Sequence, residues 1–333
     1  MKEKKKLPIS GNQLVLIIAI AVITLVFSLI NSNFFSYTNL INILVSSTLI
    51  GLTAIGITFL IMTGGNDLSA GALSAACGVL MAWGLKNTSL SWVALTFICL
   101  GLGALGGTLN GWMVTRLKIV PFIATLVSQS IWRGVAYLIC GGKPIAISDK
   151  GLQFFAKGRI FGDQGIPISV IIMFVFFIIF AYILAKTKFG RSVFAIGGNA
   201  EAARLAGINA NRVRMITYIM TSVFAGLAGV ILAGRMNSGN PAASPNLHFD
   251  AITAANLGGV SMVGGVGSIP SVALGVLLAT IYLLRRVKQF GLTEDDVTLV
   301  NMNDDSAYQA FVSGEADLAK TSYPITDNYD PEK

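Results

Sequence analysis

The sequence predicts an all-α polytopic membrane protein, and two observations carry that prediction. Of the 333 residues, 54% are hydrophobic and only 12% are charged, whereas soluble domains carry about 25% charged residues. Apolar runs of roughly the 20 residues that a spanning helix needs follow one another along most of the chain. The candidate spans, about nine in number, lie at 13–31, 39–63, 68–85, 91–115, 119–140, 167–186, 213–234, 249–266 and 268–284.

Basic residues set the expected orientation of these spans, because Lys and Arg collect in cytoplasmic loops. Four lysines precede the first span and place the N-terminus in the cytoplasm. Arg116 and Lys118 then fall inside after four spans, the 141–166 loop falls outside, and the 186–214 loop falls inside after six. The basic excess therefore reflects topology, and it predicts contact with membrane lipid and not with nucleic acid.

Charge divides the chain near residue 284. Residues 1–284 hold 19 basic and 6 acidic residues, whereas residues 285–333 hold 5 basic and 10 acidic ones. Apolar runs also end at this point. The sequence thus predicts two parts, a transmembrane domain over 1–284 and a short acidic tail over 285–333.

The 186–214 segment is the one long stretch of the first part that is dense in charge and free of a membrane-length apolar run. Within it, Asn199 is suited to cap a helix, and Glu201 lies in the first turn, where the helix dipole favours an anion. Gly207 is suited to end that helix. The pattern predicts an exposed helix on the cytoplasmic face. Spacing and charge alone leave two interpretations open, a handle for a soluble partner or an ordinary positively charged loop.

Two segments interrupt the apolar pattern. Residues 63–71 place Gly64, Gly65, Asn66 and Asp67 between apolar runs, and residues 256–270 contain five glycines and a proline. Irregular backbone at membrane depth is tolerated where it is buried in protein or lines a water-filled cavity, and transporters often contain broken spans. An acid inside a membrane is a functional candidate. For Asp67 we favour a simpler role, in which Asp67 or Ser69 caps the third span at the membrane interface.

Small residues recur every fourth position in two spans. Gly103, Gly107 and Gly111 form one such face, and Ala225 and Gly229 form another. Faces of this kind let helix backbones approach closely in lipid. We expect them to pack within one bundle and not to form a dimer seam.

The residue types that bind metals are sparse. The three cysteines, Cys77, Cys99 and Cys140, show no metal-ligand spacing, so we expect them to be small packing residues. The single histidine, His248, has no second histidine to share a metal with. We expect it to be a hydrogen-bonded residue at the membrane interface. The sequence therefore predicts no metal site.

Five stretches together match one family of membrane proteins. They are TGGNDLSAGAL at 63–73, the Asn110-Gly111 pair, RGVAYLICGGKPI at 133–145, FGRSVFAIGGNAEAARLAGI at 189–208 and LGGVSMVGGVGSIP at 257–270. On these stretches the chain, from about residue 10 to 283, resembles the membrane subunits of bacterial ATP-binding-cassette (ABC) importers for monosaccharides, the ribose/xylose/galactose-type permeases. The matching stretches are long and keep the family's order along the chain.

The resemblance implies a permease of normally ten spans in the bacterial cytoplasmic membrane, without enzymatic activity or a cofactor of its own. ATP would be hydrolysed by a separate ABC ATPase subunit, in keeping with the absence of a G-x-x-x-x-G-K-[ST] motif from the sequence. An extracytoplasmic sugar-binding protein would deliver the monosaccharide. A second permease copy, identical or a sister protein, would complete the pathway between subunits.

The resemblance also implies roles for individual residues. The 196–208 turn would be the coupling loop that docks on the ATPase, with Gly198, Asn199, Glu201, Ala202, Ala203, Arg204 and Gly207. The candidates for the translocation pathway are polar residues in or near the spans, namely Asn66, Asp67, Asn110, Gln129, Asn256 and Ser261. Gln129 and Asn256 depart from the family pattern, and as amides at depth they could tune substrate choice or could be damaging changes.

The chain also departs from the family at its end. The family continues after Leu284 with another span, whereas here a charged segment follows. Residues 290–324 resemble a fragment of a solute-binding protein of the nitrate/sulfonate type, and the tail is too short for a two-lobed core. We therefore expect a permease truncated before its last span and joined to a binding-protein fragment. A rearrangement or an assembly join is favoured over a natural fusion.

Two other functions stay open at this stage. The chain could be a truncated, non-conducting permease that only binds its ATPase partner. It could also be a secondary transporter with Asp67 as proton carrier, although that would require inverted repeats and paired acids, which the sequence does not show. Uptake that depends on an ATPase separates the importer from both alternatives.

Overall fold

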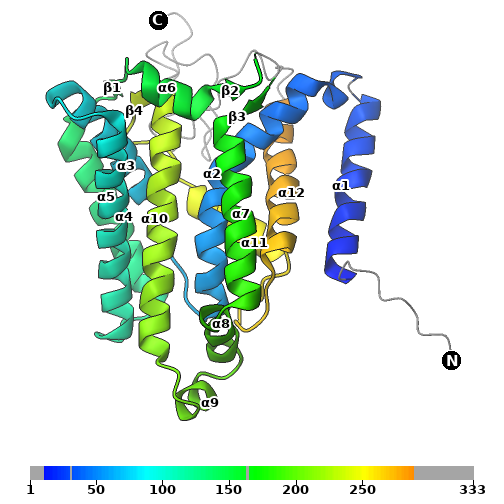
Figure 1. Cartoon of the computed structure of the whole chain (residues 1–333), viewed down its shortest axis with the longest axis vertical. Coiled ribbons are helices and arrows are strands. Elements are labelled where there is room, and N and C mark those ends of the chain that lie inside the picture. Colours follow the sequence, from blue (N-terminus) through cyan, green and yellow to red (C-terminus); the bar gives the residue numbers. More distant parts are fainter. Residues whose placement is uncertain (1–10, 31, 163–164, 289–333) are drawn as a thin grey trace, which may run out of the picture.

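Helices that run alternately up and down build a bundle (Figure 1). The computed structural model describes residues 11–30, 32–162 and 165–288. Its helices are α1 (Gly11–Ile30), η1 (Ser32–Phe35), α2 (Tyr37–Met62), α3 (Ala70–Asn87), α4 (Trp92–Thr115), α5 (Pro121–Cys140), α6 (Lys150–Lys157), α7 (Ile168–Lys186), α8 (Lys188–Gly198), α9 (Ala200–Leu205), α10 (Ala210–Met236), α11 (Leu247–Leu257) and α12 (Ile269–Lys288).

The prediction of an all-α membrane protein is confirmed. Among the described residues, α2, α4, α5, α7 and α10 are each long and apolar enough to cross a membrane. Their ends lie within three residues of the predicted spans. Shorter apolar stretches in α1 and α12 accompany them. The total of about nine spans stays a prediction.

Helix α10 lies at the centre and packs against α2, α3 and α4. Glycines bring these backbones together. A side chain on Gly103 or Gly107 of α4 would meet the backbone of α10 at 222–223 and 218–219, and one on Gly56 of α2 would meet Thr221. In the other direction, Gly229 of α10 lies against the backbone of Ser74. The expectation that these small residues pack within one bundle is confirmed.

Two cysteines join α3 to α4. Cys77 Sγ lies 3.4 Å from the carbonyl oxygen of Cys99, and Cys99 Sγ lies 3.3 Å from the carbonyl oxygen of Cys77. Both side chains are fully buried and unpaired. They are packing residues, as the sequence predicts.

The prediction of a spanning helix at 249–266 is wrong. Helix α11 ends at Leu257, and its 11 residues reach only about 16 Å at 1.5 Å per residue. Glycines explain the early end, because Gly259, Gly264 and Gly265 have φ angles of +82°, +98° and +75°, which residues with a side chain rarely adopt. The irregular backbone expected at 256–270 is confirmed over 258–268, the segment that we call the 258–268 loop.

Helices α3 and α11 begin beside each other inside the bundle. Residues 64–69 lead into α3 without forming a helix, and residues 240–246 lead into α11 in the same way. A side chain on Gly71 would meet the carbonyl oxygen of Ser244 and His248 Nδ1. From this crossing point α3 runs towards the end with α6, and α11 runs towards the end with α8 (Figure 1). The non-helical segments 64–69 and 240–246 thus meet in the core.

Short strands and α6 cover the end of the bundle opposite α9 (Figure 1). Strand β1 (Ile145–Ala146) pairs antiparallel with β4 (Ser238–Gly239), with Ile145 opposite Gly239. Strand β2 (Arg159–Ile160) pairs antiparallel with β3 (Ile166–Pro167). The predicted external loop at 141–166 therefore lies at the opposite end from the 186–214 segment, as alternating spans require.

The acidic tail falls almost entirely outside the described residues. The backbone of α12 continues to Lys288, four residues beyond the predicted end of the last span. The expected solute-binding-protein fragment at 290–324 lies outside the described part of the chain, and the domain boundary at 284 stays a prediction.

Candidate functional site

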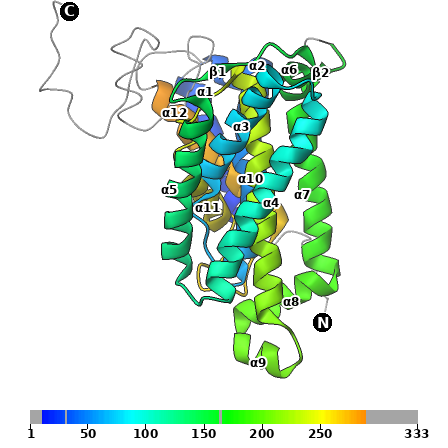
Figure 2. The ribbon, with the colours of Figure 1, turned by 90° about the vertical axis from the view of Figure 1, so that its left-hand side faces the viewer.

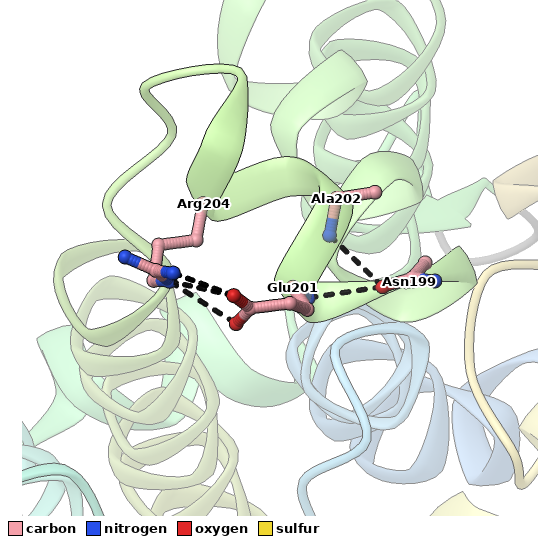
Figure 3. A network of polar contacts seen from close by, with 4 residues as sticks. All are labelled: Asn199, Glu201, Ala202 and Arg204. Carbon is pink, nitrogen blue, oxygen red and sulfur yellow. Dashed lines mark hydrogen bonds and ion pairs between the residues drawn. The ribbon is translucent and has the colours of Figure 1, made fainter.

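The coupling loop predicted at 196–208 forms a short helix that projects from one end of the bundle. Both views place α9 beyond the ends of the other helices (Figures 1 and 2). Asn199 is its N-cap, because its Oδ1 accepts hydrogen bonds from Glu201 N at 3.0 Å and Ala202 N at 2.9 Å (Figure 3). Gly207, with a φ angle of +81°, follows the helix. The predicted cap and stop are both confirmed.

The outer side of α9 carries an ion pair. Arg204 Nη2 lies 2.5 Å from Glu201 Oε1, and both side chains are 66% exposed. An exposed pair of this kind contributes little to stability, but it fixes a carboxylate and a guanidinium in one orientation (Figure 3). The hydrogen bond from Arg204 lowers the pKa of Glu201 below its ordinary value of 4.5. Leu205 beside them is 76% exposed, whereas Ala203 is buried against the bundle.

Backbone contacts connect α8 to two other segments. Gly265 N donates to the carbonyl oxygen of Met62, at the end of α2, at 3.0 Å. A side chain on Gly197 would meet the backbone of both Met62 and Gly265, and one on Gly265 would lie 2.8 Å from Gly198 N. We call Met62, Gly197, Gly198, Gly264 and Gly265 the glycine junction. It ties the base of the coupling loop to the end of α2 and to the 258–268 loop.

A second polar site lies in the core, between α3, α4 and α10. Asp67 Oδ1 accepts hydrogen bonds from Ser69 N at 2.8 Å and Ser69 Oγ at 2.6 Å. Asn110 Nδ2 donates to Ser69 Oγ at 2.8 Å and lies 3.4 Å from Asp67 Oδ1. Ser222 of α10 lies near the Asp67 carboxyl group, but no hydrogen bond joins them. The structure thus brings together Asp67 and Asn110, which are 43 positions apart in the sequence.

The core site leaves several polar atoms without partners. Asp67, Ser69 and Asn110 have no exposed surface. Among the described residues, Asp67 Oδ2, Asn110 Oδ1 and Ser222 Oγ have no hydrogen-bond partner. Asp67 holds Ser69, the N-cap residue of α3, so the predicted start of the third span at these residues is confirmed. The Asp67 carboxyl group is buried in the bundle.

Comparison with known proteins identifies the family. Residues 39–300 match the family of permease components of branched-chain amino acid transport systems. The chain belongs to this permease family. It is therefore a multi-pass membrane subunit of an import system, located in the cytoplasmic membrane.

Relatives of this permease are similar over most of their lengths. The ribose import permease protein RbsC of Bacillus subtilis is 36% identical over 259 residues, 77% of this chain and 79% of that protein. RbsC of Escherichia coli K12 is 37% identical over 265 residues, 79% of this chain and 82% of that protein. The L-arabinose transport system permease protein AraH of E. coli is 34% identical over 293 residues, 88% of this chain and 85% of that protein. No solved structure matches the permease.

The other pathway candidates of the permease lie in different places. Asn66 borders the core site, since its Oδ1 accepts from Asp67 N at 2.9 Å. Gln129 is half-buried on α5, which packs against α3. Asn256 and Ser261 lie towards the glycine junction, where the carbonyl oxygen of Ser261 accepts from Gly264 N at 2.9 Å. The structure therefore groups Asn66, Asp67 and Asn110 and leaves the other three candidates apart.

Sequence reasoning missed Arg133 of the permease. Its Nη1 donates to the carbonyl oxygens of Pro241 at 2.6 Å and Ala243 at 2.9 Å. The guanidinium of Arg133 on α5 thereby holds the turn-rich segment 240–246 that leads into α11. A signal was available, because an arginine inside an apolar span is rare and usually pairs with carboxylates or backbone carbonyls. Ser222 and Tyr218 gave no comparable signal, although Tyr218 is fully buried and its hydroxyl donates to the carbonyl oxygen of Asn66 at 3.3 Å.

The expectation that His248 is hydrogen-bonded is wrong. The side chain is 1% exposed and lies in the core of the permease. Neither ring nitrogen has a hydrogen-bond partner among the described residues. Its ring packs against Phe249 with centroids 4.2 Å apart. Within the described part of the chain, no three His, Cys, Asp or Glu side chains are grouped as a metal site would require.

Proposed function

We propose that this permease conducts a monosaccharide of the ribose, xylose or galactose type across the membrane, driven by a separate ATPase. The observation that carries the proposal is the capped helix α9, whose ion pair and Leu205 point away from the bundle. A short rigid helix is suited to transmit a rigid-body movement. The sugar class is supported by relatives named for ribose and L-arabinose import.

Three protein partners follow from this proposal. An ABC ATPase docks on Gly198, Asn199, Glu201, Ala202, Ala203, Arg204 and Gly207, and it supplies all ATP hydrolysis, so the permease itself is not an enzyme and needs no cofactor. An extracytoplasmic binding protein delivers the sugar to the end with α6. A second permease copy completes the pathway. The matching relatives are import permeases, which supports these partners as a class.

The core site has a positioning role in this proposal. Asp67 and Asn110 are wholly buried, so a sugar would meet them only if α3 and α4 separated. Their hydrogen bonds to Ser69 hold the start of α3 in place. We propose the same positioning role for Asn66, and pathway contacts for Gln129, Asn256 and Ser261.

An uptake assay tests the proposal. The permease is co-expressed with its ATPase and binding protein, and labelled ribose, xylose, galactose and arabinose are offered in turn. We expect ATP-dependent uptake of at least one sugar. Glu201→Ala should reduce it strongly, because Arg204 loses its partner and the docking face loses its carboxylate.

Two comparisons make the assay decisive. Glu201→Gln keeps the side-chain size and removes only the charge, so it separates loss of the ion pair from loss of bulk. Gly101→Ala is the control, because Gly101 lies on α4 and an added Cβ there meets nothing within 4 Å. Uptake without ATP, or no uptake of any sugar from a permease that still binds its ATPase, would contradict the proposal.

A further inference from the structure

The 258–268 loop presents apolar side chains at the same end of the molecule as α9. Val263 is 88% exposed, Val266 58% and Met262 55%. They stand on ordered backbone, since Ser261 N donates to the carbonyl oxygen of Val266 at 3.0 Å and Val263 N donates to Ser261 Oγ at 3.3 Å. A rigid apolar tip loses little conformational freedom when a partner covers it.

Charge distinguishes this loop from its neighbours. Residues 256–268 contain no charged residue, whereas Arg116, Lys118 and the six basic residues of 186–214 lie in the other segments at this end. Cytoplasmic segments that meet lipid headgroups are enriched in Lys and Arg. The centres of protein–protein interfaces are instead depleted of charge. The composition of the loop thus favours a protein partner over the membrane surface.

Position identifies which protein that partner is. The glycine junction places the loop directly against the end of α8, which only Asn199 separates from α9. Helix α9 has six residues, whereas a stable interface engages about 20–30 residues on each side. A partner that holds α9 therefore needs further surface, and the 258–268 loop is apolar, exposed and fixed to the base of α9.

We propose that the 258–268 loop is a second docking surface for the ATPase, with Val263 at its centre and Met262 and Val266 beside it. This inference rests on the proposed function, in which an ATPase holds α9. The ATPase would contact both surfaces at once. Because the glycine junction joins them, a movement of the ATPase reaches α9, the end of α2 and the loop before α12 together.

Photo-crosslinking in the assembled transporter tests this inference. Benzoylphenylalanine is placed at position 263, 205 or 161 of the permease, which is expressed with its ATPase and binding protein. After irradiation, the crosslinked partners are identified by mass spectrometry. We expect positions 263 and 205 to attach to the ATPase and position 161 not to. If position 205 attaches to the ATPase while position 263 attaches only to lipid or only to a second permease copy, this inference is overturned and the proposed function still stands. No ATPase product at either position overturns both.

Affinity measurement gives an independent readout. Val263→Asp places a charge at the centre of the proposed contact, so we expect the solubilised permease to bind its ATPase about tenfold or more weakly. The side chain is too exposed for this change to disturb the core. Phe161→Asp makes the same kind of change on a comparably exposed residue at the other end and should leave affinity unchanged. Equal affinity for Val263→Asp and the unaltered chain overturns the inference.

Discussion

Asn199 and Asp67 each fix the start of a helix through a side-chain oxygen that accepts a backbone N–H. Asn199 does so in the open, at the tip of the coupling loop. Asp67 does so in the core, where its second oxygen has no partner among the described residues. The same chemistry therefore has different costs, because an unpartnered polar atom is expensive only where water is excluded.

Removal of the Asn199 cap should weaken docking. Asn199→Ala deletes the acceptor for two N–H groups of α9, and loss of an N-cap typically costs about 0.5–2 kcal/mol of helix stability. We expect several-fold lower affinity for the ATPase, measured on the solubilised permease. Asn199→Asp keeps the acceptor and should bind nearly normally. Equal binding by Asn199→Ala and the unaltered chain would contradict the docking role of α9.

Substitutions of Asp67 should separate its hydrogen-bonding role from its charge. Asp67→Ala leaves Ser69 N without an acceptor in the core, so we expect a loss of about 1–3 kcal/mol of unfolding free energy. Asp67→Asn keeps an acceptor, and its amide can donate to Asn110 Oδ1 or Ser222 Oγ, so it should be at least as stable as the unaltered chain. Thermal unfolding in detergent measures both. A proton-carrier role would be indicated if Asp67→Asn stayed stable while it abolished uptake.

The Glu201–Arg204 pair should be insensitive to pH near neutrality. Because Arg204 lowers the pKa of Glu201 below 4.5, the stabilisation is present above the unfolded-state pKa and is lost only as pH falls through the lower folded-state value. We expect the difference in ATPase affinity between Glu201→Gln and the unaltered chain to be the same at pH 6 and pH 8. A difference that shrinks at pH 6 would mean that another group sets the charge of this face.

At the scale of elements, the glycine junction joins three segments that are far apart in the sequence. The end of α2, the end of α8 and the 258–268 loop meet through backbone atoms. Arg214 reinforces this region, since its Nε donates to the carbonyl oxygen of Thr63 at 3.1 Å. The coupling loop is thus connected to the segment 63–69, which leads into α3, and to the 258–268 loop, which joins α11 to α12.

A side chain in the glycine junction should uncouple ATP hydrolysis from transport. Gly265 has a φ angle of +75°, and an added Cβ would lie 2.8 Å from Gly198 N. Gly265→Ala should therefore push the loop away from α8, while α9 keeps its docking face. We expect the ATPase still to bind α9, but more weakly because the second docking surface is displaced, and we expect less sugar to be imported per ATP hydrolysed. Gly101→Ala is the control, because a Cβ there meets nothing within 4 Å. Normal coupling in Gly265→Ala would show that the junction transmits no movement.

The elements also show what local sequence can and cannot predict. The cap at Asn199 and the stop at Gly207 were predictable, because both signals lie within one turn of the helix that they bound. The five glycines of 256–270 indicated irregular backbone but not the end of α11 at Leu257. Hydrophobicity continues past that residue, and only the positive φ angles of the following glycines end the helix.

At the scale of the whole molecule, the long apolar helices were predictable and the contacts between them were not. Length and hydropathy place α2, α4, α5, α7 and α10 within three residues. No local pattern brings Asn110 to Ser69, or Arg133 to a carbonyl 108 positions away. His248 shows the same limit, because the sequence around one polar residue does not indicate whether its ring nitrogens will find hydrogen-bond partners.

The orientation of the bundle is testable directly. Phe161 and Leu205 lie at opposite ends and are both highly exposed. Phe161→Cys should react with a membrane-impermeant thiol reagent in intact cells, and Leu205→Cys should react only after permeabilisation, because basic loops stay in the cytoplasm. Cys140 is replaced by serine in both backgrounds. The reverse pattern would invert the predicted topology.

The reciprocal contact between Cys77 and Cys99 makes the accessibility of these two thiols a natural probe of unfolding. Both thiols are fully buried, and each lies against the other residue's carbonyl oxygen. Burial raises the cost of forming the reactive thiolate, so a reagent reaches these sulfurs only when α3 and α4 part. The rate at which these two thiols react with the reagent in mild detergent would therefore measure how fast the core opens, without any engineered probe in the chain.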